Sequence, residues 1–292
     1  MLKNKISISI LLSVVVVLAS SCGKPDAQPA PEDSDINSND SEVTPPVIQD
    51  DPCNNIFYPI ALDNQWIYQL QIDGEDGQPE IAEFGLTVSE VNESSAVLTL
   101  LDYGTGIVTQ STAECEDGSI LNFPMTEMNL VFGEVTGDMQ LEYNSGVFMP
   151  SHTDFEAENW TNTWETNFTA SVVINGIYDG ETVTIDLSES PVNMSWQVIE
   201  KDGTIQVPAG NFDDVVLIKR KVTFEVTSLK ATINGEVIEI STTLILDSDM
   251  WYSPYTGLLK QELDSATINL YGIDFPIEAI GIIELKSSNT IK

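Results

Sequence analysis

Hydrophobic and polar residues alternate with a period of two along most of the chain after residue 53. The pattern is clear in WIYQLQI (residues 66–72), SAVLTLL (95–101) and MSWQVIE (194–200), which are rich in β-branched and aromatic residues. Alternate side chains of a strand point to opposite faces of a sheet, so this period predicts strands with one buried face. No stretch of this part has the 3.6-residue period of an amphipathic helix. We therefore expect an all-β fold with minimal helix.

Short turn signals separate the alternating segments. Asn234-Gly235 stands between two of them, and Asn-Gly is the strongest short signal for a two-residue hairpin. Asn175-Gly176 is expected to form a similar hairpin with a longer loop. Long hairpins that follow one another predict a large curved antiparallel sheet, arranged either as an open barrel or like a sandwich.

The first 21 residues are organised like a bacterial export signal. Lys3 and Lys5 precede an apolar run, residues 6–18, and the small residues of LASSC lead to Cys22. The run is too short to remain as a membrane-spanning helix. LASSC resembles a bacterial lipobox, in which the signal is removed before the cysteine and the thiol carries a diacylglycerol. We expect a lipoprotein signal peptide over residues 1–21 and lipidation of Cys22, with an ordinary secretory signal as the alternative.

The composition changes between the signal and the alternating region. Residues 22–52 are acidic, rich in proline and free of aromatic residues, which predicts a disordered linker on the lipid anchor. Residues 53–292 are then expected to form a single β domain. Gly23 after the cysteine, instead of the aspartate of inner-membrane retention, resembles an outer-membrane sorting signal. We expect a lipid-anchored protein of the bacterial outer membrane, periplasmic or surface-exposed, that meets the membrane through Cys22.

The chain is strongly acidic, with 46 Asp and Glu against 11 Lys and Arg and a formal net charge of -35. No Lys or Arg occurs between Pro25 and Glu200. Such a surface repels nucleic acid and anionic lipid headgroups, so we expect no nucleic-acid partner. The hydrophobic content of 42% is too high for an acidic disordered chain, which indicates a folded domain.

Two cysteines remain when Cys22 is assigned to the anchor. Cys53 and Cys115 are an even pair in an exported protein, which favours a disulfide, and two free thiols are the alternative.

The sequence KRK contains Arg220, the only arginine of the chain. Period-two alternation places it on one strand face with five apolar residues, Val216, Ile218, Val222, Phe224 and Val226. The opposite face is expected to hold Val215, Leu217, Lys219, Lys221, Thr223 and Glu225. The three cations therefore do not form one basic patch.

An inward arginine needs a partner, because an unpaired buried charge costs several kcal/mol. A carboxylate on a neighbouring strand is one candidate partner of Arg220. The alternative is the acid head of a ligand at the edge of an apolar cavity. The guanidinium fork suits either partner, so Arg220 is a candidate ligand-binding residue.

Three aromatic residues, Trp160, Trp164 and Phe168, are spaced by four in ENWTNTWETNF. An extended strand would place all three on one face. If that face is covered, the residues are core. If it is exposed, Trp160 and Trp164 form a stacking platform for sugars.

Catalytic signals are weak. His152 is the only histidine, no Ser or Cys lies in a nucleophile-elbow context, and neither remaining cysteine has a CxxC partner. We expect no catalytic residue, metal or cofactor. A hydrolase that uses paired carboxylates is the least favoured alternative, because the many acids single out no pair.

Three segments have counterparts in a known family. NIFYPIALDNQWIYQL (55–70), TIQVPAGNFDDVVLIKR (204–220) and DMWYSPYTGLLKQEL (249–263) resemble the Y-P-L-x-x-G-x-x-W-x-Y, V-P-A-G-x-F-x-x-V and W-Y-x-P-G-x-G-L-V-K elements of TapB-like bacterial lipoproteins of unknown function. Asp63-Asn64 stands where the family has a glycine turn, and Tyr255-Thr256 replaces Pro-Gly. The resemblance implies an exported, mostly β domain and brings no catalytic residues.

Taken together, these patterns favour a lipid-anchored, non-enzymatic envelope protein. Its curved sheet is expected to bind an apolar ligand or an envelope protein on a concave apolar face. The alternative is a glycan-binding module that uses Trp160 and Trp164.

Overall fold

The computed structural model describes residues 53–73, 79–104, 106–122, 127–132, 135–178, 181–233, 236–270, 273–277 and 281–291. The predicted signal peptide, the lipidation site Cys22 and the predicted linker lie outside these ranges.

Nearly all of the described chain forms β-strands. The strands of the first half are β1 (Asn54–Asn55), β2 (Tyr58–Pro59), β3 (Gln65–Asp73), β4 (Pro79–Val91), β5 (Ser95–Asp102), β6 (Val108–Glu116), β7 (Ser119–Ile120), β8 (Glu127–Phe132) and β9 (Val135–Gly146). After the short helix α2 (His152–Ala157) come β10 (Thr163–Tyr178), β11 (Glu181–Val207), β12 (Gly210–Ile233), β13 (Glu236–Ser253), β14 (Gly257–Leu270), β15 (Ile273–Ile277) and β16 (Gly281–Ser288).

Apart from the β1–β2 pair, these strands form one antiparallel sheet in the order β7-β6-β5-β4-β3-β16-β14-β13-β12-β11-β10-β9-β8, with β15 paired to β14. The last described strand, β16, pairs with the early strand β3, so the first and last strands of this sheet in chain order are neighbours inside it. The sheet is large and curved and does not close on itself, which confirms the expected fold class.

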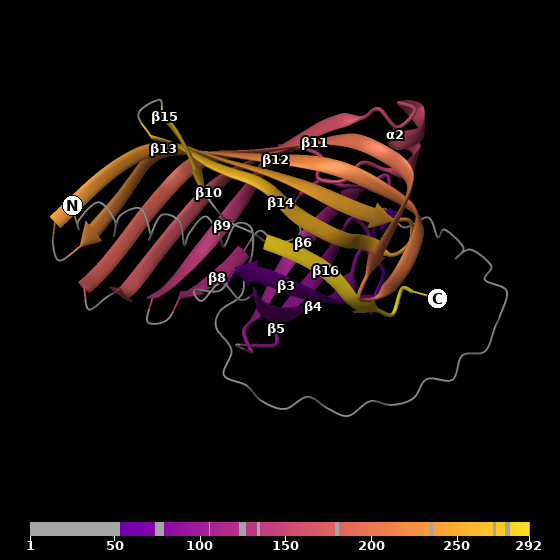
Figure 1. Cartoon of the computed structure of the whole chain (residues 1–292), viewed down its shortest axis with the longest axis horizontal. Helices are drawn as coiled ribbons and strands as arrows, with labels where there is room; N and C mark the ends of the chain where they lie inside the picture. The colour runs from indigo at the N-terminus through magenta and orange to yellow at the C-terminus, as the bar shows by residue number, and fades with distance from the viewer. Residues whose placement is uncertain are drawn as a thin grey trace.

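The long strands β10–β14 arch over the shorter strands β3–β6 (Figure 1). Apolar side chains from both groups are buried in one core, such as Val88 and Leu98 beneath and Ile218 and Phe224 above. The alternation on β5 is regular, with every second residue buried. The inner face of the long strands is therefore packed as core where the second group covers it, rather than open as the expected concave binding face.

The hairpin between β12 and β13 follows the expected position. The pair Ile233 and Glu236 flanks Asn234-Gly235, which lies outside the described ranges. The hairpin expected at Asn175-Gly176 is wrong, because both residues pair with β9 on one side and with β11 on the other. The strand continues through them, and the β10–β11 pairing ends between Tyr178 and Glu181.

One residue of β12 departs from the predicted alternation. Val215 was expected to face outward but is only 2% exposed, and Val216 next to it is also buried. The pairing of β11 with β12 shifts register here, between the pairs Gly203–Val215 and Ile205–Phe212, and Asp214 has a left-handed φ of +59°. From Phe212 to Val215, β12 has one residue more than β11 has from Gly203 to Ile205, and this β-bulge breaks the period of two.

A disulfide fixes the start of the domain to the sheet, and the short helix α2 has a capped N-terminus. A disulfide joins Cys53, before β1, to Cys115 on β6, with Cα atoms 5.0 Å apart and both residues buried. Helix α2 begins with a capping box in which Ser151 and Asp154 exchange hydrogen bonds.

Among the residues described, no helix has the length and apolarity needed to cross a membrane.

Candidate functional site

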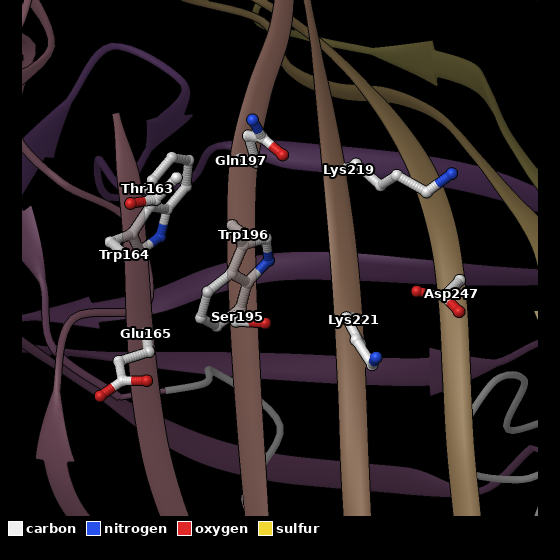
Figure 2. A pocket seen from close by; sticks show the side chains of 9 residues that line it. All are labelled: Thr163, Trp164, Glu165, Ser195, Trp196, Gln197, Lys219, Lys221 and Asp247. Atoms are coloured by element: carbon white, nitrogen blue, oxygen red, sulfur yellow. The ribbon is translucent and has the colours of Figure 1, made fainter. Parts of the chain in front are cut away.

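A polar groove with a volume of about 580 Å³ lies on the outer face of β10–β13. Its polar residues lie on the side of these strands that faces away from the strands beneath, whereas Trp164 and Trp196 belong to the row between them that faces inward (Figure 2). Its lining residues are Thr163, Trp164, Glu165, Ser195, Trp196, Gln197, Lys219, Lys221 and Asp247. The volume falls within the range of small-molecule sites, but the lining is far more polar than is usual for them.

Two cross-strand rows of outward residues make up this groove and its rim. In each row, every residue is the backbone partner of the next. The first row is Glu165, Ser195, Lys221 and Asp247. The second row is Thr163, Gln197, Lys219 and Asp249. Directly opposed residues have closely spaced side chains, so the rows bring hydroxyl, amide and charged groups together on one surface.

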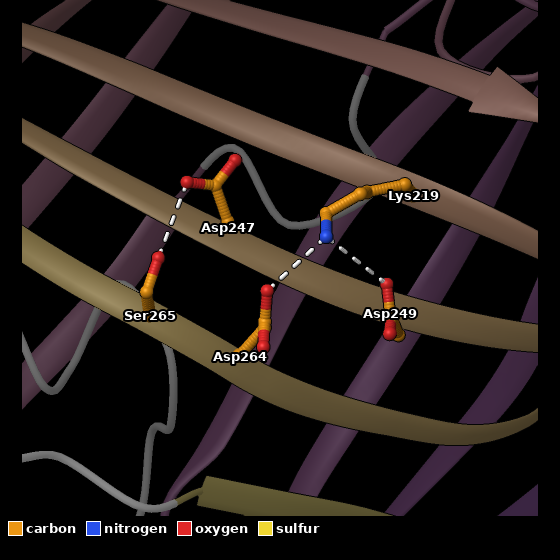
Figure 3. A network of polar contacts seen from close by, with 5 residues as sticks. All are labelled: Lys219, Asp247, Asp249, Asp264 and Ser265. Atoms are coloured by element: carbon orange, nitrogen blue, oxygen red, sulfur yellow. Dashed lines mark hydrogen bonds and ion pairs between the residues drawn. The ribbon is translucent and has the colours of Figure 1, made fainter.

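Lys219 is held by acids at the edge of the groove. Its Nζ lies 3.1 Å from an oxygen of Asp264 and 3.9 Å from one of Asp249 (Figure 3). The hydrogen bond to Asp264, followed by the charge of Asp249, raises the pKa of Lys219 above its ordinary value. Beside this pair, Ser265 donates a hydrogen bond of 3.2 Å to Asp247. Lys219 is therefore committed to the protein's own carboxylates.

Lys221 differs from its neighbour. It is exposed on the same face, and within the described part of the chain no carboxylate lies within ion-pair distance of its Nζ. Lys221 is therefore the groove cation that can still take a ligand group.

Arg220 points to the other side of β12. It is 6% exposed, and its backbone partners are Trp196 on β11 and Ser248 on β13. Its Nη2 donates a hydrogen bond of 3.4 Å to Ser248, and no residue in the described part of the chain accepts from its Nε. Burial lowers the pKa of Arg220. The expected carboxylate on a neighbouring strand is not found among the described residues. None of them therefore supplies an anionic partner for Arg220.

Of the two alternatives for the aromatic residues, the structure favours core over an exposed platform. Trp160 lies in the turn after α2 with a φ of +60°, outside the strand, and its ring stacks on Phe155 at 5.4 Å. Trp164 lies on β10 and stacks on Trp196 at 5.9 Å, and Phe168 is buried. Both tryptophans pack against the core. A common face for all three was wrong because the strand begins only at Thr163.

The single histidine is engaged within helix α2. His152 begins α2, and its Nε2 lies 3.2 Å from the carboxylate of Glu156 on the same helix. Across the described ranges, no group of three or more His, Cys, Asp or Glu is placed to hold a metal ion.

The groove brings together residues that sequence reasoning did not single out. Ser195, Gln197 and Asp247 are ordinary polar positions on alternating strands, and only their register makes them neighbours. The available signal was the polar face of each strand. The sequence reveals neither the bulge near Val215 nor the true end of the β10–β11 hairpin. The register between these strands therefore could not be predicted from their polar faces.

Comparison with known proteins identifies no family. No family profile matches the chain, and no curated protein matches it. The crystal structure of a candidate lipoprotein from Parabacteroides distasonis is similar, with 17% sequence identity and a TM-score of 0.42 over 80% of this chain and 99% of that one. A likeness this weak carries no argument about function.

Proposed function

We propose that this chain is a lipid-anchored protein of the bacterial cell envelope that binds a polar, saccharide-like ligand in the outer-face groove and catalyses no reaction. The observation that carries the proposal is the groove itself, because it joins a volume of about 580 Å³ to two aligned rows of hydrogen-bonding side chains.

The chemistry of the lining favours a hydroxyl-rich ligand without a net negative charge. Ser195, Thr163 and Gln197 can each donate and accept hydrogen bonds, as sugar hydroxyls require. Lys221 adds one donor without an internal partner among the described acids. The carboxylates of Glu165 and Asp247 line the same groove and disfavour an anion.

The spacing of those carboxylates argues against a glycoside hydrolase. Glu165 is on β10 and Asp247 on β13, with β11 and β12 between them. Three strand spacings of about 4.8 Å separate the two backbones by roughly 14 Å. Paired catalytic carboxylates lie only about 5–9.5 Å apart. Glu165 and Asp247 are therefore too far apart to act as such a pair, which supports binding over hydrolysis by these two residues.

Anchoring and export rest on the N-terminal sequence. The lysines, apolar run and LASSC support a lipid on Cys22 followed by a linker of about thirty residues, which spans on the order of 30 Å as a flexible coil. That reach would let the groove face away from the membrane.

The test is binding of the mature, detergent-solubilised protein to a panel of immobilised neutral oligosaccharides, including maltoheptaose, cellohexaose, chitohexaose and xylohexaose. We expect saturable binding to at least one member. Ser195→Tyr fills the groove and should abolish that binding, whereas Glu225→Tyr, on the outer face of β12 beyond the groove, should preserve it. Absence of binding to every member, or equal binding by Ser195→Tyr, would overturn the proposal.

A further inference from the structure

Arg220 is a buried cation within an apolar part of the sheet. Its nearest inward neighbours along β12 are Ile218 and Val222, and both are buried. Across the pairing, the indole of Trp196 and the hydroxyl of Ser248 flank it. Desolvation of a guanidinium in such surroundings costs several kcal/mol unless an anion and hydrogen bonds compensate.

The phenol of Tyr252, the titratable group that affects the pKa of Arg220, does not provide an anion. Tyr252 lies on β13 and is buried, and burial raises its pKa well above the ordinary value. Its phenol is therefore neutral at physiological pH, and its hydroxyl donates to Met250 Sδ at 3.8 Å. The described carboxylates contribute no ion pair to Arg220 either.

The guanidinium presents one edge with unused hydrogen-bonding capacity. The N–H groups of Nε and Nη2 are nearly parallel on the same edge of an arginine, and they match the two oxygens of a carboxylate. Among the residues that the structure describes, none accepts from Nε, and Nη2 contacts Ser248 at 3.4 Å. The Ser248 hydroxyl accepts from Nη2, which leaves its own proton as a further donor beside this edge.

We propose that Arg220, through its Nε and Nη2 edge, binds the carboxylate group of a ligand on the inner side of the sheet, with Ser248 as a second donor. This site is separate from the outer groove, because Arg220 and the groove lysines lie on opposite faces of β12. A small organic acid and the head of a longer aliphatic acid share this chemistry.

The experiment is thermal unfolding of the mature, detergent-solubilised protein with increasing sodium acetate or sodium hexanoate, at constant ionic strength set by sodium chloride. We expect a saturable rise in Tm with at least one acid. A response to hexanoate alone identifies an aliphatic acid, and equal responses identify a small acid. Absence of any rise in the wild-type protein overturns the proposal.

Two variants and one control assign the effect to Arg220. Arg220→Met keeps an unbranched side chain up to about the position of Nε but removes the guanidinium, and it should abolish the rise in Tm. Arg220→Lys keeps the charge but loses the two-donor edge, so its apparent Kd should increase by at least about tenfold. Lys221→Met removes the adjacent outward charge and should respond like the wild type. If the arginine variants respond like the wild type, Arg220 is not the site, and should Arg220→Met fail to fold, Arg220→Lys still decides the question.

Discussion

Gly146 ends β9 in a conformation and a space that suit only glycine. Its φ is +101°, and it pairs with Thr166 on β10. A Cβ at this position would lie 2.7 Å from the Thr166 Cα and would meet the Glu165 carbonyl oxygen even more closely. These atoms belong to the backbone of a paired strand, so they cannot move aside as a flexible side chain could.

Gly146→Ala should therefore lower the free energy of unfolding by roughly 2–4 kcal/mol, from backbone strain and the clash together. Gly106→Ala is the matched control, because Gly106 also has a positive φ, +73°, but nothing lies within 4 Å of its Cβ position. It should cost only about 1 kcal/mol. Urea unfolding of both variants measures the difference, and equal losses would show that the close approach at Gly146 is unimportant.

Strand β12 carries a different surface on each face. From Val216 to Val226 its even-numbered residues are buried, including Arg220, while Lys221 and Glu225 are exposed. Because β11 and β13 pair with it on both sides, its inward side chains are enclosed by neighbours on two strands. Because neighbouring residues of β12 point to opposite faces, Lys221 lies in the groove and Arg220, one residue earlier, lies on the inner face.

This arrangement predicts that substitutions at neighbouring positions of β12 change the stability of the domain by very different amounts. Phe224 is 2% exposed, so Phe224→Ala should destabilise the domain by about 3–5 kcal/mol through lost burial and the cavity left behind. Glu225→Ala, one residue later on the exposed face, should change stability by no more than about 0.5 kcal/mol. Equilibrium unfolding in urea tests both, and similar losses at the two positions would contradict the observed register.

At the scale of the whole molecule, the sheet depends on contacts between distant parts of the chain. Strand β3 pairs with β16, and the Trp66 indole of β3 donates a hydrogen bond of 2.6 Å to the Thr256 carbonyl. The disulfide between Cys53 and Cys115 spans 62 residues and holds the start of the domain against β6.

Replacing both cysteines, as Cys53→Ser/Cys115→Ser, should lower the free energy of unfolding by up to about 4 kcal/mol, since the unfolded chain regains the entropy of an open loop. Calorimetry of the wild type with and without reductant is the comparison. Reduced wild type and the double variant should unfold at similar temperatures. A reductant that leaves the wild-type Tm unchanged would mean that the bond contributes little or resists reduction.

Sequence patterns by themselves determined the properties that arise from neighbouring residues. Period-two alternation predicted the strands and placed Arg220 on a buried face, because side-chain direction depends only on position along a strand. Composition predicted the acidic surface of the chain. The same local reasoning could not choose between Asn175-Gly176 and the next turn signal as the end of a hairpin.

Only the tertiary structure decided which strands are neighbours, and in what register. The bulge beside Val215, the stacking of Trp164 on Trp196 and the alignment of Ser195 with Lys221 all depend on pairing between separate strands. Such pairing is stabilised by the packing of two layers against one core, a property of the whole sheet that no single segment contains. The outer groove exists for the same reason, since its residues come from four strands brought together by that register.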